Sequence, residues 1–294
     1  HLLGEHSWFC KDKTISMAMN LYVHIAVSKR DDGLAKIYFH QLNDRKKITI
    51  STNKFRKEDK WANAVKSVIY GFTSGGFSIG GVDITVYTDI MPSAGFGITT
   101  AMKAATAIAL RKLFELNCSD VQLLQVLERG NRLFLKKNNF LSDNYAALFA
   151  KKGSLIITDY AKISWDYVPF NFPNRKIIIT DTTVPRISVW NEDTLFDPKY
   201  ALLLGELKDK KNNVYGGWSY INSIADIDEV LEVLQKDEQR KLMAIIREHS
   251  DVLDIREGVE KGDFFKLARA INHSHETVRE FFDISCPEIE WIVK

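Results

Sequence analysis

Cysteine is scarce in this chain of 294 residues, which has three, at Cys10, Cys118 and Cys286. Their odd number and wide spacing exclude a disulfide framework and a CxxC metal site, and indicate a reducing compartment. Charge of one sign is not in excess either, because 40 Lys and Arg stand against 38 Asp and Glu. A formal charge of +2 is too balanced for a nucleic-acid groove or an anionic membrane surface, so we expect neither partner.

Long apolar runs are also missing. No run reaches the roughly 18 residues needed to cross a bilayer, and we expect no signal peptide before the fold, so we expect a cytoplasmic protein. The share of hydrophobic residues, 45%, is sufficient for a substantial core. Both ends interrupt expected elements, a strand at 1–4 and a helix at 289–294, and we therefore expect a longer polypeptide.

The spacing of apolar residues predicts a mixed α/β first part. Two β-rich runs, at 21–27 and 35–39, flank the turn Asp31-Asp32-Gly33 and predict a hairpin. Ser119 is a plausible N-cap for one of the helices. Further strands are predicted at 82–90, 154–158 and 176–180, and helices at 61–73, 101–116, 119–134 and 145–150.

A change of class is predicted in the second half, which becomes mainly helical beyond about residue 196. The segment 169–174, with two prolines, is the best candidate for a joint between domains. Amphipathic patterns predict helices at 227–234, 238–249, 252–261, 264–281 and 287–293.

The loop at 92–100 is the first candidate for chemistry, because it lies between a predicted strand and a predicted helix. Its glycines, Gly95 and Gly97, allow backbone N–H groups to approach an anion, and the helix adds its positive N-terminal end. Thr99 and Thr100 supply hydroxyl groups that suit phosphate or Mg²⁺. On the loop alone an ordinary tight turn is the favoured interpretation, since this is neither a Walker A loop nor a GxGxxG motif.

Several collinear segments change that interpretation, because in order and spacing they resemble the motifs of galactokinases, members of the GHMP kinase superfamily. The first is Leu2-Leu3-Gly4-Glu5-His6, which is similar to N-L-I-G-E-H. The other segments are 61–70, 80–92, the loop at 92–100, 104–113, 143–159, the Asn-His-Ser-His of 272–275 and the Ser-Cys-Pro-Glu of 285–288.

The resemblance implies a two-domain α+β fold of the GHMP kinase type, with an active site in the cleft between the domains. We assign 1–172 to a mixed α/β N-terminal domain that carries the phosphate loop. A mainly helical C-terminal domain with a small sheet, incomplete here, takes 173–294. The implied activity is phosphorylation of the anomeric hydroxyl of galactose or a related sugar, with ATP and Mg²⁺, and we favour a monomer.

The resemblance also assigns roles to individual residues. Asp143 stands at the catalytic carboxylate, which takes or orients the proton of the acceptor hydroxyl. Sugar binding is assigned to Glu5, His6 and Trp8, and metal binding to Thr100 and Asn131. Binding of the ATP phosphates is assigned to Ala94, Gly95, Phe96, Gly97, Ile98, Thr99, Thr100 and Ala101.

Departures from the family pattern leave alternatives open. Trp8 replaces an aspartate that binds sugar hydroxyls, and Asn131 replaces a glutamate twelve residues before the catalytic aspartate. Glu128, nearly one turn earlier, is an alternative metal ligand, and Thr99 an alternative to Thr100. These changes allow two other functions: a degenerate sugar or nucleotide sensor, and a GHMP kinase for a small alcohol that is not a sugar.

Each assigned residue also has a structural alternative. Asp143 suits the N-cap of a helix, Glu5 a surface carboxylate, and His6 a structural imidazole. His273 and His275 lie two residues apart, a spacing that a helix does not place on one face, so we expect packing and helix-end capping there and not a metal site.

Overall fold

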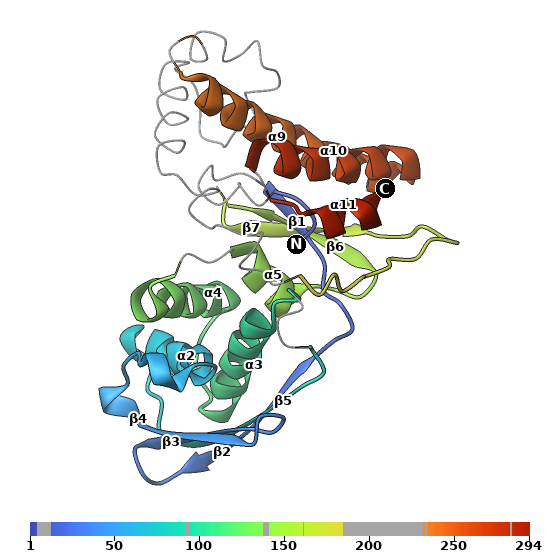
Figure 1. Cartoon of the computed structure of the whole chain (residues 1–294). Helices are drawn as coiled ribbons and strands as arrows, with labels where there is room; N and C mark the ends of the chain where they lie inside the picture. Colours follow the sequence, from blue (N-terminus) through green and yellow to red (C-terminus); the bar gives the residue numbers. More distant parts are fainter. Residues whose placement is uncertain are drawn as a thin grey trace. The chain divides into compact units, whose positions relative to one another are not determined.

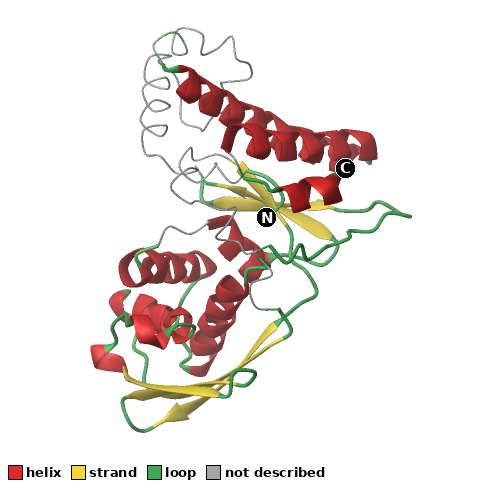
Figure 2. Cartoon of the chain, viewed as in Figure 1, coloured by secondary structure: helices red, strands yellow, loops and turns green. Residues whose placement is uncertain are grey.

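The computed structural model describes residues 1–4, 13–91, 95–137, 141–160, 162–184, 232, 234–282 and 284–294. They form two compact units. We name them by their place in the sequence: the central unit holds residues 18–149, and the outer unit combines the flanking segments 1–17 and 150–294. Each contains a sheet and helices (Figures 1 and 2), so the predicted α+β class is confirmed. Within the described residues, no helix is both long and apolar enough to cross a membrane.

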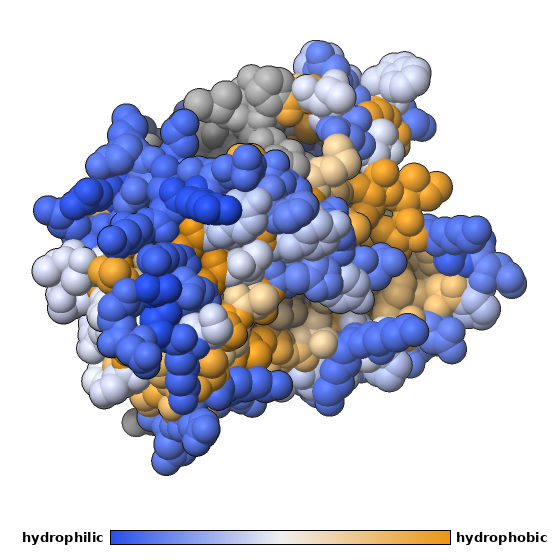
Figure 3. All heavy atoms as spheres, turned by 90° about the horizontal axis from the view of Figure 1, so that it is seen from below, coloured by the Kyte–Doolittle hydropathy of each residue, from blue (hydrophilic) through white to orange (hydrophobic). Residues whose placement is uncertain are grey.

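The central unit has a four-stranded sheet in the order β2-β5-β3-β4. Helices cover one face of this sheet (Figure 1), and the inward side chains of β3 and β5 are buried, among them Ile37, Phe39, Ile84 and Val86. The elements are β2 (Val23–Arg30), β3 (Leu34–Phe39), β4 (Asp44–Thr49), α2 (Ala62–Ser74), β5 (Gly81–Thr88), α3 (Ile98–Leu113), α4 (Asp120–Arg129), a π-helix η3 (Gly130–Leu135) and α5 (Leu141–Phe149). Seen from below Figure 1, the surface is mostly hydrophilic with hydrophobic residues between (Figure 3).

The predicted hairpin between 21–27 and 35–39 is wrong. Both strands form, but β5 lies between them, antiparallel to β2 and parallel to β3. The turn at 31–33 therefore crosses the end of β5, and Arg30 holds it there by donating to Asp32 and to Asp83 of β5. Gly81 is required under this crossing, because a Cβ atom there would come within 1.8 Å of the Asp32 carbonyl oxygen.

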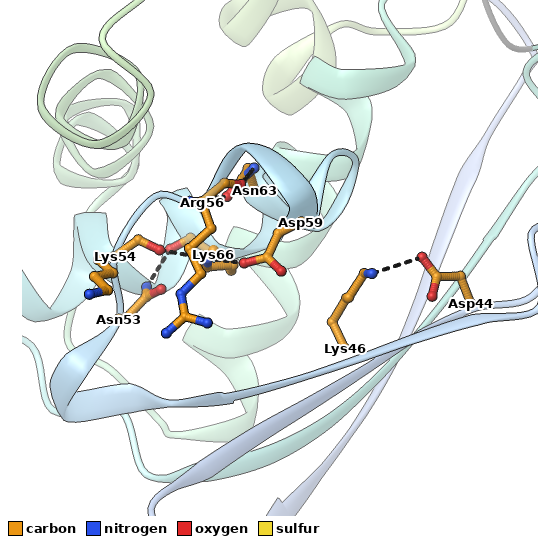
Figure 4. Close-up of polar contacts among 8 residues, drawn as sticks. All are labelled: Asp44, Lys46, Asn53, Lys54, Arg56, Asp59, Asn63 and Lys66. Atoms are coloured by element: carbon orange, nitrogen blue, oxygen red, sulfur yellow. Dashed lines mark hydrogen bonds and ion pairs between the residues drawn. The ribbon is translucent and has the colours of Figure 1, made fainter.

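The helix α2 fulfils its prediction and also anchors the loop before it. Lys66 is 1% exposed, and its ammonium donates to the Lys54 carbonyl at 2.6 Å and pairs with Asp59 (Figure 4). Asn53 donates to the Lys66 carbonyl at 2.8 Å. A second asparagine, Asn63, donates to the backbone of the same loop. These contacts satisfy a buried charge and fix the loop on the helix.

Ser119 is confirmed as the N-cap of α4. Its hydroxyl accepts from the Gln122 amide while the Gln122 side chain accepts from the Ser119 amide, which completes a capping box. The helix is shorter than predicted, since η3 takes over at Gly130. That residue packs closely on α2, because a Cβ atom there would lie 2.5 Å from the Ser67 carbonyl oxygen.

The outer unit has a three-stranded antiparallel sheet in the order β1-β6-β7. Its core joins the sheet to two long helices through residues such as Ile15, Ile157, Val252 and Ile255. The elements are β1 (Lys13–Ser16), β6 (Ser154–Asp159), β7 (Ser164–Pro169), α9 (Lys236–Lys261), α10 (Phe264–Phe282) and α11 (Pro287–Val293).

Two helical predictions merge in this unit. The patterns at 238–249 and 252–261 belong to one helix, α9, which ends where Gly262 adopts a left-handed φ of 66°. The predictions at 264–281 and 287–293 correspond to α10 and α11. Most of the predicted helix at 227–234 lies outside the described residues.

The strand predicted at 176–180 is wrong. This segment belongs to no strand, and Ile178 is 85% exposed although an apolar run predicts a buried one. The division between the units falls at 149/150. The domain boundary at 172/173 stays a prediction, since 185–231 lies outside the described residues.

Candidate active site

The Gly-containing loop enters α3 as the sequence predicts, and the helix begins three residues earlier than expected, at Ile98. Gly97 is its N-cap, with a left-handed φ of 68°, and Gly95 has a φ of 79°. Among the described residues, no atom lies within 4 Å of a Cβ position at either glycine, so the left-handed backbone conformation favours glycine there.

The first turn of α3 presents backbone donors that have no partner within the helix. The Ala101 amide makes the first helical bond, to the Gly97 carbonyl at 2.9 Å, which leaves the N–H groups of the three preceding residues without intrahelical partners. The first turn itself contains no acidic residue, and the side chain of its N-cap makes no capping hydrogen bond among the described residues. Of the two hydroxyls, Thr99 is exposed and Thr100 is 7% exposed. Such a turn suits an anion. Ala94 lies outside the described residues, while Phe96 is half-buried.

Asp143 lies in the first turn of α5, as the third residue of a helix that begins at Leu141. The N-cap interpretation is therefore wrong, because a cap precedes the helix. The residue is half-buried, and α5 packs against both α3 and α4. Asp143 thus shares the central unit with the loop at 95–97 and the start of α3.

A residue that sequence reasoning missed lies beside this aspartate. Lys103, one turn along α3 from Thr100, is 3% exposed, and its Nζ donates to Oδ1 of Asn131 in η3 at 2.6 Å. Burial lowers the pKa of Lys103 to about 8, against the attraction of Asp143 and, less strongly, Glu128. The missed signal is periodicity, since Thr100, Lys103, Ala107 and Leu110 form one buried face.

Asn131, one of the residues predicted to hold Mg²⁺, does not fit that role. Its carbonyl oxygen, expected at the metal, accepts from the Lys103 ammonium, and a cation in that place repels a dication. Glu128 is largely buried, which raises the pKa of its carboxyl. Across the described part of the chain, no group of three or more His, Cys, Asp or Glu side chains could hold a metal ion.

The residues predicted to bind the sugar, Glu5, His6 and Trp8, lie outside the described residues. The backbone just before them is held by a buried carboxylate of α9. Glu248, 3% exposed, accepts from the Gly4 amide at 2.9 Å and from the Ser274 hydroxyl at 2.8 Å. Gly4 has a φ of 88°, which favours glycine at this position.

The two histidines of α10 each contact a carboxylate. Nδ1 of His273 lies 2.8 Å from both oxygens of the buried Asp251, and Nε2 of His275 lies 3.1 Å from Glu290 in α11. They lie within α10 and not at its end, so the capping expectation is wrong, and these contacts join α10 to its neighbours.

Comparisons with known proteins identify the family of this chain. The model of the GHMP kinases N terminal domain matches residues 62–151, which include the loop, Lys103, Asn131 and Asp143. A protein of Treponema pallidum named "Putative galactokinase" is 34% identical over 296 residues, which cover 100% of this chain and 73% of that protein. The chain belongs to the GHMP kinase superfamily and is galactokinase-like.

More distant relatives of this galactokinase-like chain extend the comparison. The galactokinase of Thermotoga maritima is 24% identical over 294 residues, 100% of this chain and 79% of that protein. The crystal structure of Lactococcus lactis galactokinase complexed with galactose has a TM-score of 0.81 at 15% identity, covering 98% of this chain and 75% of that one. A mevalonate kinase structure has a TM-score of 0.57 at 14% identity, with 99% and 80% covered. Both structures share the GHMP kinase fold.

Proposed function

We propose that this protein is an ATP-dependent sugar 1-kinase, which phosphorylates the anomeric hydroxyl of galactose or a related sugar. The observation that carries the proposal is the position of Asp143. This half-buried carboxylate lies on a helix packed against α3, whose first turn presents amides without intrahelical partners after a glycine loop. An acceptor for a hydroxyl proton and donors for phosphate oxygens are the two requirements of phosphoryl transfer to an alcohol.

Catalysis of this kind consists mainly of positioning and charge stabilisation. The amides of the first turn of α3 would hold phosphate oxygens of ATP, with the Thr99 and Thr100 hydroxyls beside them. Asp143 would orient the sugar hydroxyl and take its proton as the sugar oxygen bonds to the γ-phosphorus and the bond from that phosphorus to ADP breaks. The attraction between the buried Lys103 ammonium and Asp143 favours the ionised carboxylate that this role needs.

Galactose or a close relative is the proposed acceptor, since several relatives of this chain are named galactokinases. Glu5 and His6 would bind sugar hydroxyls. Trp8 would stack its indole on the apolar face of the ring, because an indole does not accept a hydrogen bond as the family's aspartate does. We further propose that the protein is a cytoplasmic monomer.

The test is ADP release from MgATP by the full-length protein against aldoses, uronic acids and N-acetylated sugars, alongside Asp143→Asn. We expect turnover with at least one hexose and its loss in the variant. Binding of ADP and a sugar without turnover on any acceptor would support a sensor instead. Turnover on mevalonate or homoserine but on no sugar would support a kinase for another alcohol. Activity that survived Asp143→Asn would contradict the role of this carboxylate.

A further inference from the structure

The contact between Lys103 and Asn131 joins two side chains that a folded protein rarely buries without a function. Both are almost inaccessible, at 3% and 1% exposed. Their contact, at 2.6 Å, links α3 to η3. No carboxylate among the described residues is in hydrogen-bond contact with this lysine, so its charge is compensated only at longer range, by Asp143 and Glu128.

The orientation of the Asn131 amide is fixed by its partner. An ammonium only donates, so the atom facing Lys103 Nζ has to be the carbonyl oxygen. The amide nitrogen then points elsewhere, and Nδ2 of Asn131 is buried with no hydrogen-bond partner among the described residues. An ammonium has three donors, and the Asn131 oxygen takes one of those on Lys103.

This pair therefore offers donors and positive charge. A metal site has the opposite character, because Mg²⁺ requires oxygen atoms with free lone pairs and no competing cation. Buried donors with positive charge suit an anion, and the anion that the proposed reaction brings near Asp143 is the phosphate chain of the nucleotide.

We propose that the Lys103 ammonium is a permanent cation of the phosphate site. It binds the oxygen of Asn131 in place of a divalent metal, and it neutralises phosphate charge of the bound nucleotide. This inference rests on the proposed function for the identity of the anion. The exclusion of metal from Asn131 follows from the contact itself and is tested separately.

The first measurement is Mn²⁺ binding, followed by electron paramagnetic resonance with and without ADP. Asn131→Ala is expected to leave the Mn²⁺ affinity of the wild type unchanged. The double variant Lys103→Met/Asn131→Glu, which removes the ammonium and adds a carboxylate, is expected to bind Mn²⁺ ~10–100-fold more tightly. The proposal is overturned if Asn131→Ala weakens Mn²⁺ binding, or if the double variant binds no better than the wild type.

The second measurement is ADP affinity by calorimetry in the presence of EDTA. Lys103→Met is expected to weaken ADP binding by about 10- to 100-fold, the loss of one charged hydrogen bond. Lys112→Met, on the exposed side of the same helix, is the control and should bind as the wild type does. Unchanged affinity in Lys103→Met would overturn the proposal.

Folding is checked by circular dichroism for each variant. Should Lys103→Met not fold, Lys103→Gln keeps a donor for Asn131 without the charge and makes the same comparison. If the wild type binds no ADP, the proposed function fails. The Mn²⁺ measurements without nucleotide would still decide whether Lys103 excludes a metal from Asn131.

Discussion

The Glu248 carboxylate accepts a hydrogen bond from the backbone amide of Gly4 at 2.9 Å, although the two residues are 244 positions apart in the sequence. Its second oxygen accepts from the Ser274 hydroxyl at 2.8 Å. One buried side chain of α9 thus fixes the backbone immediately before the residues assigned to the sugar and also joins α9 to α10.

Replacing Glu248 by glutamine should therefore affect both stability and sugar binding. The new amide nitrogen cannot accept, so one buried donor loses its partner, at a cost of roughly 1–3 kcal/mol in the free energy of unfolding. We expect the KM for the sugar to rise while the KM for ATP stays unchanged. Urea unfolding and steady-state kinetics measure the two effects.

The matched control is Glu257→Gln on the same helix. Glu257 forms ion pairs with Lys261 and Lys266 at the surface, and the free energy of unfolding should change by no more than about 1 kcal/mol. Equal effects of the two substitutions would contradict the anchoring role of Glu248.

Asp143→Asn should lower kcat by roughly 10²–10⁴-fold. The change is nearly isosteric and the residue is half-buried, so thermal unfolding should stay close to that of the wild type. A rise in KM with kcat unchanged would indicate that Asp143 binds the substrate and does not act in the chemical step.

Gly97→Ala tests the left-handed N-cap of α3. A Cβ atom added at this φ of 68° meets no atom of the described residues within 4 Å but costs about 1–2 kcal/mol in backbone energy. We expect weaker ATP binding, because the turn before the free amides distorts. Gly33→Ala, where a Cβ atom also has open space and no left-handed φ is required, is the control. Indistinguishable ATP affinities in the two variants would argue against a role for the loop.

The buried Lys103 predicts a dependence of stability on pH. Burial lowers its pKa from 10.5 to about 8 in the folded protein, so between these values the unfolded chain holds a proton that the folded chain has released. Stability then rises with pH across this interval, by roughly 3 kcal/mol in total. Below pH 8 both states are charged, and the cost of burying the charge is constant.

The measurement is urea unfolding of the wild type and Lys103→Met from pH 8 to pH 10.5. The variant should lack this rise, so the difference between the two proteins is the informative quantity. Parallel curves would show that Lys103 keeps an ordinary pKa.

Local signals in the sequence predicted local structure well. Ser119 has a free hydroxyl before an amphipathic run and caps α4 as expected, and the strand, loop and helix around Gly97 also follow the prediction. The prediction of which strands pair failed, because strand pairing depends on segments that are distant in the sequence. The β2 and β3 strands were placed side by side because nothing nearby reveals that β5 separates them.

The candidate site shows the same limit. Asp143 is assigned through its motif, and the local sequence does not predict that it lies inside the first turn of α5 and not at the cap. Lys103 was missed because a lysine is usually solvated. Only the folded position of η3, which packs on α2 and α4, shows that this lysine meets the amide oxygen of Asn131.

The turn that passes over Gly81 has a consequence for how the chain folds. The strands on either side of β5 are complete some forty residues before β5 is synthesised, yet they are not neighbours in the folded sheet. The sheet forms only when β5 enters between these two strands, and β5 is synthesised after α2. Long-range closure of this kind slows folding and leaves strand edges unpaired in the meantime. We expect a nascent chain released before residue 88 to be prone to aggregation, whereas one extended past α3 can close the sheet.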